Sequence, residues 1–442
     1  MKGDRAANSW YWTATVTLAV ETAQPGTNEA AHVSALSGIR VIDLSGIAGQ
    51  YCGKMFADLG ADVILVEPPG GSSTRREGPF LNNRIHSESS LTFSYFNTGK
   101  RSIVIDIDSR AGQEVLRKLI GTADLVLETE KPGAMKARSL DFSALVGSFP
   151  KIIVTSITPF GQTGPYANYE SEDIVMLAIG GLLALGGYFD SEPIAAYGNQ
   201  AYLAAAQFAA VASLMALLGN EQKPGDARSR HIDVSIQECV VLALENTAQQ
   251  YDLQKITRGR EAGQQKLAGT GLFPCDDGHI YLMASGIASS GFWKNTIRWL
   301  EEEGIENTHQ LQEPRWTDYE YLATEEAKSR FGNLFGPFAA RHAKSYLYNA
   351  GQAHRVPICP VNSPKDIVEN RQLDFRGFFS EISHTFSGSV LKMPGAPYRL
   401  TETPWRVSGP SPMLGQHTSE ILTELGIEFG AQAALLKAGA VG

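Results

Sequence analysis

The carboxylate of Asp173 is predicted to lie past the end of a strand, a position where α/β proteins often bind ligands. Asp173 follows a loop rich in glycine and proline, residues 159–166, and opens an apolar run that extends to Leu185. Residues 151–158, which precede this loop, are β-branched and apolar, a composition typical of a buried strand. Asp173 is therefore predicted to begin a helix just past the carboxyl end of a strand. Ligands of open α/β sheets bind at that edge.

Two roles are open to this carboxylate from its spacing alone. It can stabilise the first turn of its own helix, an interaction worth about 0.3–1 kcal/mol. It can also attack an activated carbonyl group as a covalent nucleophile. Spacing by itself favours the first role, because anionic side chains are stabilising at helix N-termini. The neighbouring acids Glu170 and Glu172 are expected to be solvated or to act only through other residues.

The composition of the chain is that of an ordinary globular protein. Its 442 residues are 43% hydrophobic and 19% charged, and a chain of this length usually forms two domains. The net charge of −9, with no segment dominated by Lys and Arg, argues against binding of nucleic acid. The cysteines show no metal-ligand spacing, so we expect reduced thiols, no metal site and a cytoplasmic location. These residues are Cys52, Cys239, Cys275 and Cys359.

The N-terminal segment gives no functional signal. Its apolar stretch, residues 10–20, is interrupted by threonines and is too short to span a bilayer. We therefore expect no membrane association, and we interpret residues 1–35 as an extension outside the folded core.

Alternating strand and helix patterns predict an α/β fold with a parallel sheet. Residues 37–45 and 62–67 are predicted to be buried strands on either side of a helix at residues 52–59. The turn after the first strand has no G-x-G-x-x-G sequence, so a dinucleotide site is not indicated. Further strands are predicted at residues 103–106 and 124–129, and further helices at residues 109–120 and 201–218.

Patterns are sparser in the second half of the chain. The polar residues 223–226 are the predicted domain boundary. Residues 273–283 predict a β-hairpin that turns at Asp277 and Gly278. Residues 291–350 are expected to be mainly helical.

Several motifs, taken in order, resemble those of the family III CoA-transferases, the relatives of formyl-CoA and carnitine CoA-transferases. The most specific is the loop F-G-Q-T-G-P-Y at residues 160–166, followed by Asp173. Others are F-N-T-G-K-R-S at residues 96–102 and L-G-Q-H-T at residues 414–418. The similarity extends in order over residues 37–427, and an ordered set of motifs is unlikely to arise by chance.

The resemblance implies a covalent reaction and reverses the preference between the two roles of Asp173. In the family this aspartate accepts coenzyme A from an acyl-CoA donor as an aspartyl-CoA thioester, and a carboxylic acid then takes it. Coenzyme A is thus expected as a substrate, with no tightly bound cofactor. A glycine-containing loop, here residues 262–271, is the candidate lid.

Contacts with coenzyme A are also implied by the resemblance, at a glycine turn and at basic or amide side chains. The expected residues are Ala48, Arg75, Arg76, Asn97, Arg101, Lys131 and Lys136. Two departures from the family pattern are noted, since Thr129 and Glu130 replace the usual Asn-Phe pair and Gln416 replaces a Glu.

For the fold, the resemblance implies a Rossmann-like parallel-sheet domain built from both chain ends, with an inserted smaller α+β domain. The large domain would occupy residues 36–225, and residues 346–442 would return to it after a linker. The small domain would occupy residues 226–345. The subunits of the family interlock, so a homodimer is expected.

α-Methylacyl-CoA racemases share this fold and are the main alternative. Racemisation needs an acid and a base on opposite faces of an α-carbon, and racemases typically have His where this chain has Glu172. An intramolecular CoA transfer, which would make the enzyme an isomerase, would use the same nucleophile and stays open. A non-catalytic acyl-CoA-binding homologue is disfavoured by the presence of Asp173. No residue pattern identifies particular donor or acceptor acids.

Overall fold

The computed structural model describes residues 34–188, 190–260, 265–286 and 291–442. All but the last two positions of the predicted N-terminal extension therefore lie outside the described residues. The part of the candidate lid at residues 262–264 lies outside them as well.

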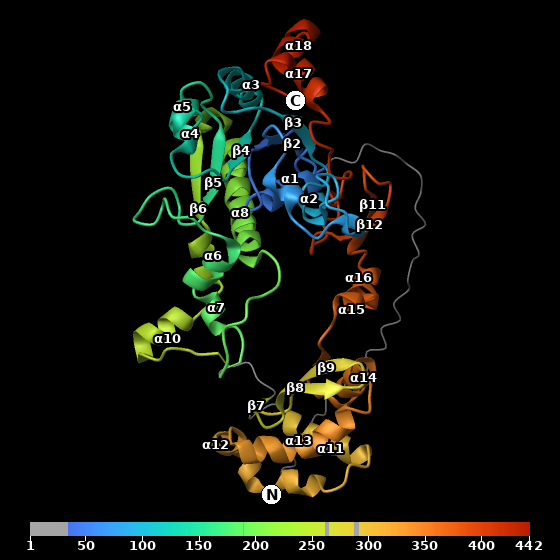
Figure 1. The fold of residues 1–442 in the computed structure, drawn as a ribbon. Coiled ribbons are helices and arrows are strands. Elements are labelled where there is room, and N and C mark those ends of the chain that lie inside the picture. The colour runs from blue at the N-terminus through green and yellow to red at the C-terminus, as the bar shows by residue number, and fades with distance from the viewer. Residues whose placement is uncertain (1–33, 189, 261–264, 287–290) are drawn as a thin grey trace, which may run out of the picture. The chain divides into compact units, whose positions relative to one another are not determined.

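Six parallel strands form the main sheet, in the order β3-β2-β1-β4-β5-β6 (Figure 1). The α/β class predicted from the sequence is confirmed. The strands are β1 (Arg40–Asp43), β2 (Asp62–Glu67), β3 (Arg101–Val104), β4 (Leu125–Glu128), β5 (Ile153–Thr158) and β6 (Arg230–Ser235). After β1, the chain adds β2 and β3 on one side of it and then β4, β5 and β6 on the other. The direction of strand addition therefore reverses between β1 and β4, which is the switch point of the sheet.

Helices cover both faces of this sheet, which explains why its strands are apolar on both sides. In β1, Val41 faces one cluster of buried side chains and Ile42 faces another. The first face is covered by α1 (Gln50–Asp58), α6 (Asp173–Ile179), α8 (Gln200–Gln222) and α9 (Ile236–Leu242). The opposite face is covered by α3 (Arg110–Ile120), α4 (Ala134–Ala137), α5 (Phe142–Val146) and α17 (Thr418–Glu424).

Strand β6 corrects the boundary predicted at residues 225 and 226. It pairs in parallel with β5 along its whole length. The polar residues 223–226 include a 3-10 turn, Pro224–Asp226, between α8 and this strand. The chain thus leaves the large sheet later than expected, because a turn between a helix and a strand has the same polar composition as a linker between domains.

The C-terminal segment returns to the edge of the same sheet. The His417 backbone N–H donates to the Ser102 carbonyl oxygen at 3.0 Å, and Val441 forms an isolated bridge with Ile105. Helices α17 and α18 (Phe429–Lys437) lie between these two contacts in the sequence. Strand β3 therefore pairs with β2 on one side and contacts the C-terminal segment on the other.

A separate, smaller antiparallel sheet has the order β10-β9-β8-β7. The predicted hairpin is present as β8 (Thr270–Cys275) and β9 (Gly278–Met283), although Asp276 and Asp277 form its turn. A buried core joins this sheet to the neighbouring helices. The other elements of this part are β7 (Gln265–Leu267), β10 (Ile358–Pro360), α11 (Phe292–Glu302), α12 (Tyr319–Leu322), α13 (Glu325–Ala339) and α14 (Lys344–His354).

The remaining elements are short. They are α2 (Leu91–Phe96), α7 (Leu182–Leu185), α10 (Thr247–Gln254), α15 (Pro364–Val368), α16 (Arg371–Phe375), β11 (Phe379–Ser383) and β12 (Val390–Pro394). The last two form an antiparallel hairpin.

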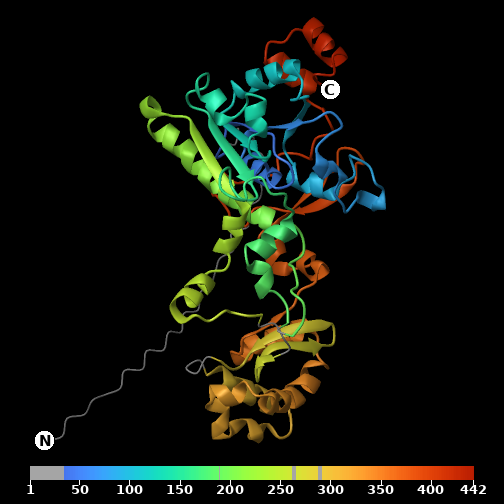
Figure 2. The ribbon, with the colours of Figure 1, turned by 60° about the vertical axis from the view of Figure 1, so that its left-hand side comes forward.

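Helix α8 is apolar on opposite sides, and it runs alongside β5 and β6 (Figure 2). The side that faces the sheet is rich in alanine, which lets the helix approach the strands closely. The other side exposes four large apolar side chains, Phe208, Val211, Met215 and Leu218. By length and composition α8 could cross a membrane, but its alanine side belongs to the buried core.

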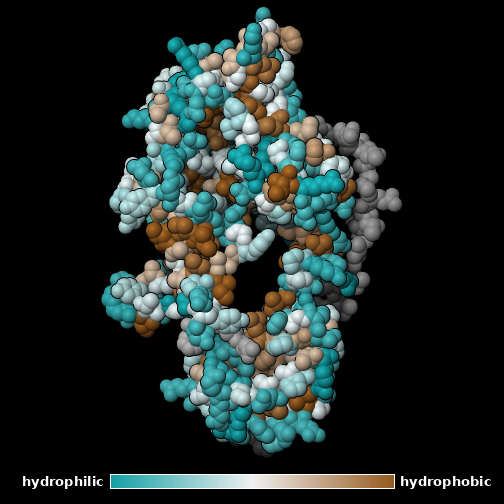
Figure 3. Space-filling view, viewed as in Figure 1, coloured by the Kyte–Doolittle hydropathy of each residue, from teal (hydrophilic) through white to brown (hydrophobic). Residues whose placement is uncertain are grey.

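Exposed apolar side chains also lie on α6. Ile174, Val175 and Ile179 are each more than two-fifths exposed, and apolar residues gather over this helix in the surface view (Figure 3). Two helices that pack against the same sheet thus both expose large apolar side chains.

Candidate active site

The loops that follow β1 and β4 meet at the switch point. The Gly46 backbone N–H donates to Thr129 Oγ1 at 2.8 Å. Gly49 permits this approach, because a Cβ at that position would lie 2.9 Å from Thr129 Cγ2 and closer still to Ser45. Ala48, which is half-buried, lies in the same turn. Ligands of doubly wound sheets bind in such a crevice.

Asp173 is the first residue of α6, and the residue as a whole is only 8% exposed. Its Oδ1 accepts a hydrogen bond from the Tyr202 backbone N–H at 3.0 Å. Tyr202 belongs to the first turn of α8, whose N-cap residue, Asn199, makes no side-chain capping bond. The Asp173 carboxylate therefore accepts a hydrogen bond from the first turn of α8, in the place of a side-chain cap from Asn199.

Two opposing effects act on the Asp173 carboxyl group. Burial raises its pKa, whereas the backbone N–H groups of Tyr202, Ala201 and Gln200 lower it, and burial is the larger effect. The N-terminus of α8 also carries a partial positive charge that favours the ionised form. The result is a poorly hydrated carboxylate held by fixed dipoles, which is a suitable environment for a nucleophile.

Three aromatic side chains gather in the loop between β5 and α6, and we call them the aromatic cluster. The rings of Tyr166 and Tyr169 are 5.1 Å apart, and Phe160 lies 5.8 and 6.3 Å from them. Phe160 packs against the core that includes α6, whereas the tyrosines are 45% and 59% exposed. An accessible aromatic surface thus lies a few residues from Asp173.

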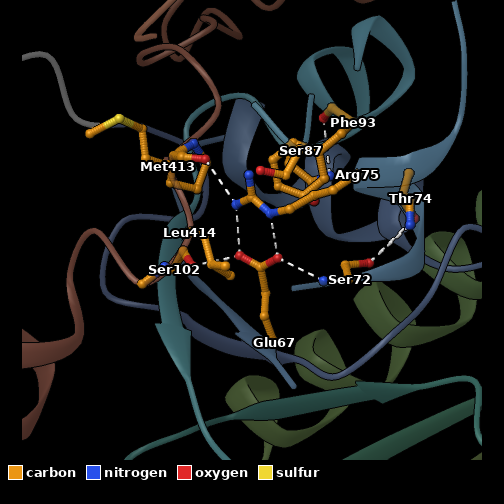
Figure 4. A network of polar contacts seen from close by, with 12 residues as sticks. Glu67, Ser72, Thr74, Arg75, Ser87, Phe93, Ser102, Met413 and Leu414 are labelled. Carbon is orange, nitrogen blue, oxygen red and sulfur yellow. Dashed lines mark hydrogen bonds and ion pairs between the residues drawn. The ribbon is translucent and has the colours of Figure 1, made fainter. Parts of the chain in front are cut away.

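A buried ion pair fixes the loop that follows β2. Arg75 is fully buried, and its Nε and Nη2 donate to the two Glu67 carboxylate oxygens at 2.7 and 2.8 Å (Figure 4). The same guanidinium donates to Glu88 and to the Pro412 carbonyl oxygen. Ser102 Oγ also donates to Glu67, at 2.6 Å. One carboxylate therefore joins β2, β3 and, through Arg75, the C-terminal segment.

A second buried ion pair lies beside the glycine turn. Lys100 Nζ donates to Asp43 at 2.7 Å and to the Gln50 carbonyl oxygen and Asn97 Oδ1, both at 2.8 Å. Asn97 Nδ2 donates to Gln50 Oε1 at 3.0 Å. Gln50 Nε2 in turn donates to Ser72, whose backbone N–H binds Glu67. The two ion pairs thus belong to one buried polar network.

Four of the seven predicted coenzyme contacts are at least partly accessible and lie in segments that follow the carboxyl ends of strands. Ala48 is half-buried, and Arg76, Lys131 and Lys136 are exposed. Lys131 forms an ion pair with Glu170, in the loop that leads to Asp173. These basic residues are accessible to an anionic ligand at the edge where Asp173 also lies.

The other three candidates are placed differently. Arg75 and Asn97 are fully buried within the polar network, and contact with a ligand would require its bonds to open. Arg101 is the first residue of β3 and therefore lies at the amino edge of the sheet, where it pairs with Asp62 and Glu424. Arg75 and Asn97 thus hold the loops in place. Arg101 lies at the opposite edge of the sheet from Asp173.

Glu128, at the end of β4, is a buried acid near the switch point. Its Oε2 accepts a hydrogen bond from the Glu130 backbone N–H at 2.7 Å. Burial raises its pKa to about 7, although the Ser156 hydroxyl group opposes this shift. The Glu128 carboxyl group therefore exchanges a proton near neutral pH.

The amides of α8 were missed by sequence reasoning. The alanine-rich run was identified as a buried helix, but no local pattern indicates that its N-terminus meets Asp173. The missing N-cap bond at Asn199 is the one relevant signal, and it is visible only in the folded chain.

Comparisons with known proteins agree on one family. The family described as CoA-transferase family III matches residues 36–418. A relative from Thauera aromatica, succinyl-CoA:(R)-benzylsuccinate CoA-transferase subunit, is 39% identical over 92% of this chain and 98% of its own. A succinate–glutarate CoA-transferase from Agrobacterium fabrum is 30% identical over 88% of this chain and 95% of its own.

Solved structures show the same architecture. A CaiB/BaiF family protein from Brucella suis superposes with a TM-score of 0.77 at 27% identity, covering 89% of this chain and 99% of its own. The sheet order and the separate small sheet described above are therefore those of a known fold.

We predict that Arg75→Met lowers the free energy of unfolding by about 3–5 kcal/mol, because it leaves the buried Glu67 carboxylate unpaired. The matched control is Arg76→Met, which removes an exposed arginine from the next position and should change stability by less than about 0.5 kcal/mol. Denaturant titrations followed by circular dichroism compare the two variants. Equal denaturation midpoints for the two variants would show that the Arg75–Glu67 ion pair does not stabilise the loop after β2.

Proposed function

The chain belongs to CoA-transferase family III, and we propose that it moves coenzyme A between two carboxylic acids through a thioester on Asp173. The observation that carries this proposal is the buried Asp173 carboxylate, bound by the first turn of α8 past the carboxyl end of β5. Burial limits the access of water to the reacting group, and acyl anhydrides require that protection.

The proposed reaction consists of balanced carbonyl exchanges. Asp173 attacks the donor thioester through one oxygen, the C–S bond breaks, and a mixed anhydride and CoA thiolate form. The thiolate attacks the Asp173 carbonyl carbon, releasing the donor acid and leaving an aspartyl-CoA thioester. The acceptor acid displaces the thiolate to form a second anhydride. The thiolate then takes the acceptor acyl group and frees Asp173.

Coenzyme A is proposed to lie along the switch-point crevice. Arg76, Lys131 and Lys136 supply exposed positive charge for its phosphates in a chain whose net charge is −9. The backbone at Ala48 offers close approach to the pantetheine arm. Arg75 and Asn97 would act indirectly, by holding these loops in place.

The relatives suggest dicarboxylic acids as the acyl groups. The names of the Thauera and Agrobacterium enzymes include succinyl-CoA or succinate, so we propose succinyl-CoA as the donor. The name of the Thauera enzyme includes (R)-benzylsuccinate, and the aromatic cluster, in the loop that leads to Asp173, offers a surface for a phenyl ring. An aryl-substituted dicarboxylic acid is therefore the proposed acceptor.

We also propose that two copies of this chain assemble through α8. Its exposed residues Phe208, Val211, Met215 and Leu218 alternate at spacings of three and four, the repeat by which helices pack against one another. A helix that is apolar on all sides is normally buried. A homodimer covers this stripe, as expected from the family resemblance.

The racemase alternative receives no support from the site. Glu172 precedes Asp173, and the bonds to the Asp173 carboxylate come from backbone amides of α8. Racemisation would need a second proton-transfer group opposite the Asp173 carboxylate, where the described residues supply backbone N–H groups instead.

Asp173→Asn and Asp173→Ala should lower the rate of CoA exchange by at least about 10³-fold, because the covalent path loses its nucleophile. Glu172→Gln, at the neighbouring exposed position, should retain activity. Chromatography of the CoA esters gives the rates, and hydroxylamine trapping followed by peptide mass mapping should modify Asp173 alone. Undiminished transfer by Asp173→Ala would refute the proposed chemistry.

With succinyl-CoA as the donor, benzylsuccinate should be a better acceptor than glutarate. Replacing Tyr166 and Tyr169 together by Leu should raise KM for benzylsuccinate roughly three- to tenfold, the loss expected for one aromatic contact, and leave KM for glutarate unchanged. Tyr251→Leu, an exposed tyrosine on α10, is the control. If the double variant weakens both acids equally, the aromatic cluster does not select the ring.

The pair Val211→Glu and Met215→Glu should convert the homodimer to monomer, since it places charges in the proposed interface. Gln222→Glu adds a charge at the exposed end of the same helix and should leave the dimer intact. Size-exclusion chromatography with light scattering reports the masses. A wild-type chain that is monomeric by itself would overturn this assembly and favour a different partner chain.

A further inference from the structure

The hydrogen bond from α8 distinguishes the two oxygens of Asp173. Oδ1 accepts the Tyr202 backbone N–H. We propose that the first-turn backbone N–H groups of Ala201 and Tyr202 form the oxyanion site for Asp173 itself. They would hold Oδ1 as its carbonyl oxygen throughout catalysis, while only Oδ2 is exchanged. This inference rests on the proposed covalent function.

Charge develops twice on the carbonyl oxygen of acylated Asp173. It appears first when the CoA thiolate attacks the mixed anhydride, and again when the acceptor acid attacks the aspartyl-CoA thioester. In both intermediates the former carbonyl carbon is tetrahedral and its oxygen is negative. Donors already in place at Oδ1 bind that oxyanion more strongly than the neutral carbonyl, so they lower both barriers.

The α8 amides have the properties that such donors need. They belong to a helix of 23 residues whose N-cap residue makes no side-chain bond, and first-turn N–H groups have no intrahelical acceptor. The N–H of Gln200 donates instead to the Gly198 carbonyl oxygen at 3.1 Å. The helix is held against the sheet by buried alanines, among them Ala205, Ala206 and Ala209. The donors are therefore fixed before charge develops, and no reorganisation is needed.

The fate of each oxygen follows from this arrangement. Oδ2 attacks the donor carbonyl carbon and leaves with the donor acid when the thiolate cleaves the anhydride. The acceptor acid then supplies one oxygen, which stays on Asp173 when the second anhydride is cleaved. If Oδ1 stays bound to α8, the carboxylate does not rotate between turnovers, and the same position is exchanged each time.

An isotope experiment tests the inference on the wild-type enzyme. The full chain is incubated with a small amount of succinyl-CoA and a large excess of succinate labelled in all its carboxylate oxygens with the heavy isotope. After many turnovers the reaction is quenched in acid and digested with pepsin. Mass spectrometry of the peptide that contains Asp173 counts the heavy oxygens on that side chain.

Three outcomes separate this inference from the proposed function. Incorporation that stops at one heavy oxygen supports both. Incorporation that rises to two heavy oxygens overturns the fixed role of Oδ1 but retains the covalent path. If CoA exchange proceeds and no heavy oxygen enters Asp173, the covalent function itself fails, and this inference with it.

A pair of variants examines the amides directly. Ala201→Pro removes one of the proposed backbone N–H donors in the first helical turn, where proline is tolerated, and Ala201→Gly changes the side chain but keeps the N–H. The proline variant should have a kcat roughly tenfold or more below that of the glycine variant, with KM unchanged. Equal kcat values in two folded variants would overturn the role of the amides.

Discussion

The bond between Asp173 and the first turn of α8 is the contact on which the proposed active site depends. Its two partners are 29 positions apart in the chain, and they meet only when α6 and α8 pack on the same face of the sheet. The alanines of α8 set that packing, because small side chains allow the helix to approach the strands. A change in the position of α8 would therefore displace the amides from the reacting carboxylate.

The two buried ion pairs give the coenzyme side of the site a comparable rigidity. Removing charged groups from water is costly unless each one is paired and hydrogen-bonded. Here Glu67 and Lys100 each have several partners, so the network satisfies them while joining the loops after β1 and β2. The exposed basic side chains of Arg76, after β2, and of Lys131 and Lys136, after β4, then remain available for an anionic ligand.

Helix α8 would link the proposed catalysis to the proposed assembly. One side lies in the core, its first turn binds Asp173, and its opposite side carries the exposed apolar stripe. In the proposed dimer, burial of that stripe would stabilise the helix that positions the nucleophile. Activity and oligomeric state would then be coupled, since stability of the site would depend on the partner.

Local patterns in the sequence were sufficient for strands β1 to β5 and for Asp173 at the head of α6, because strand composition and glycine-rich turns depend on near neighbours. They did not separate Arg75 from Arg76, although one is buried and the other exposed. They also did not place Arg101 at the amino edge or join β6 to the large sheet. Those outcomes depend on contacts between distant segments, as does the binding of Asp173 by α8, and only the packed tertiary structure determines them.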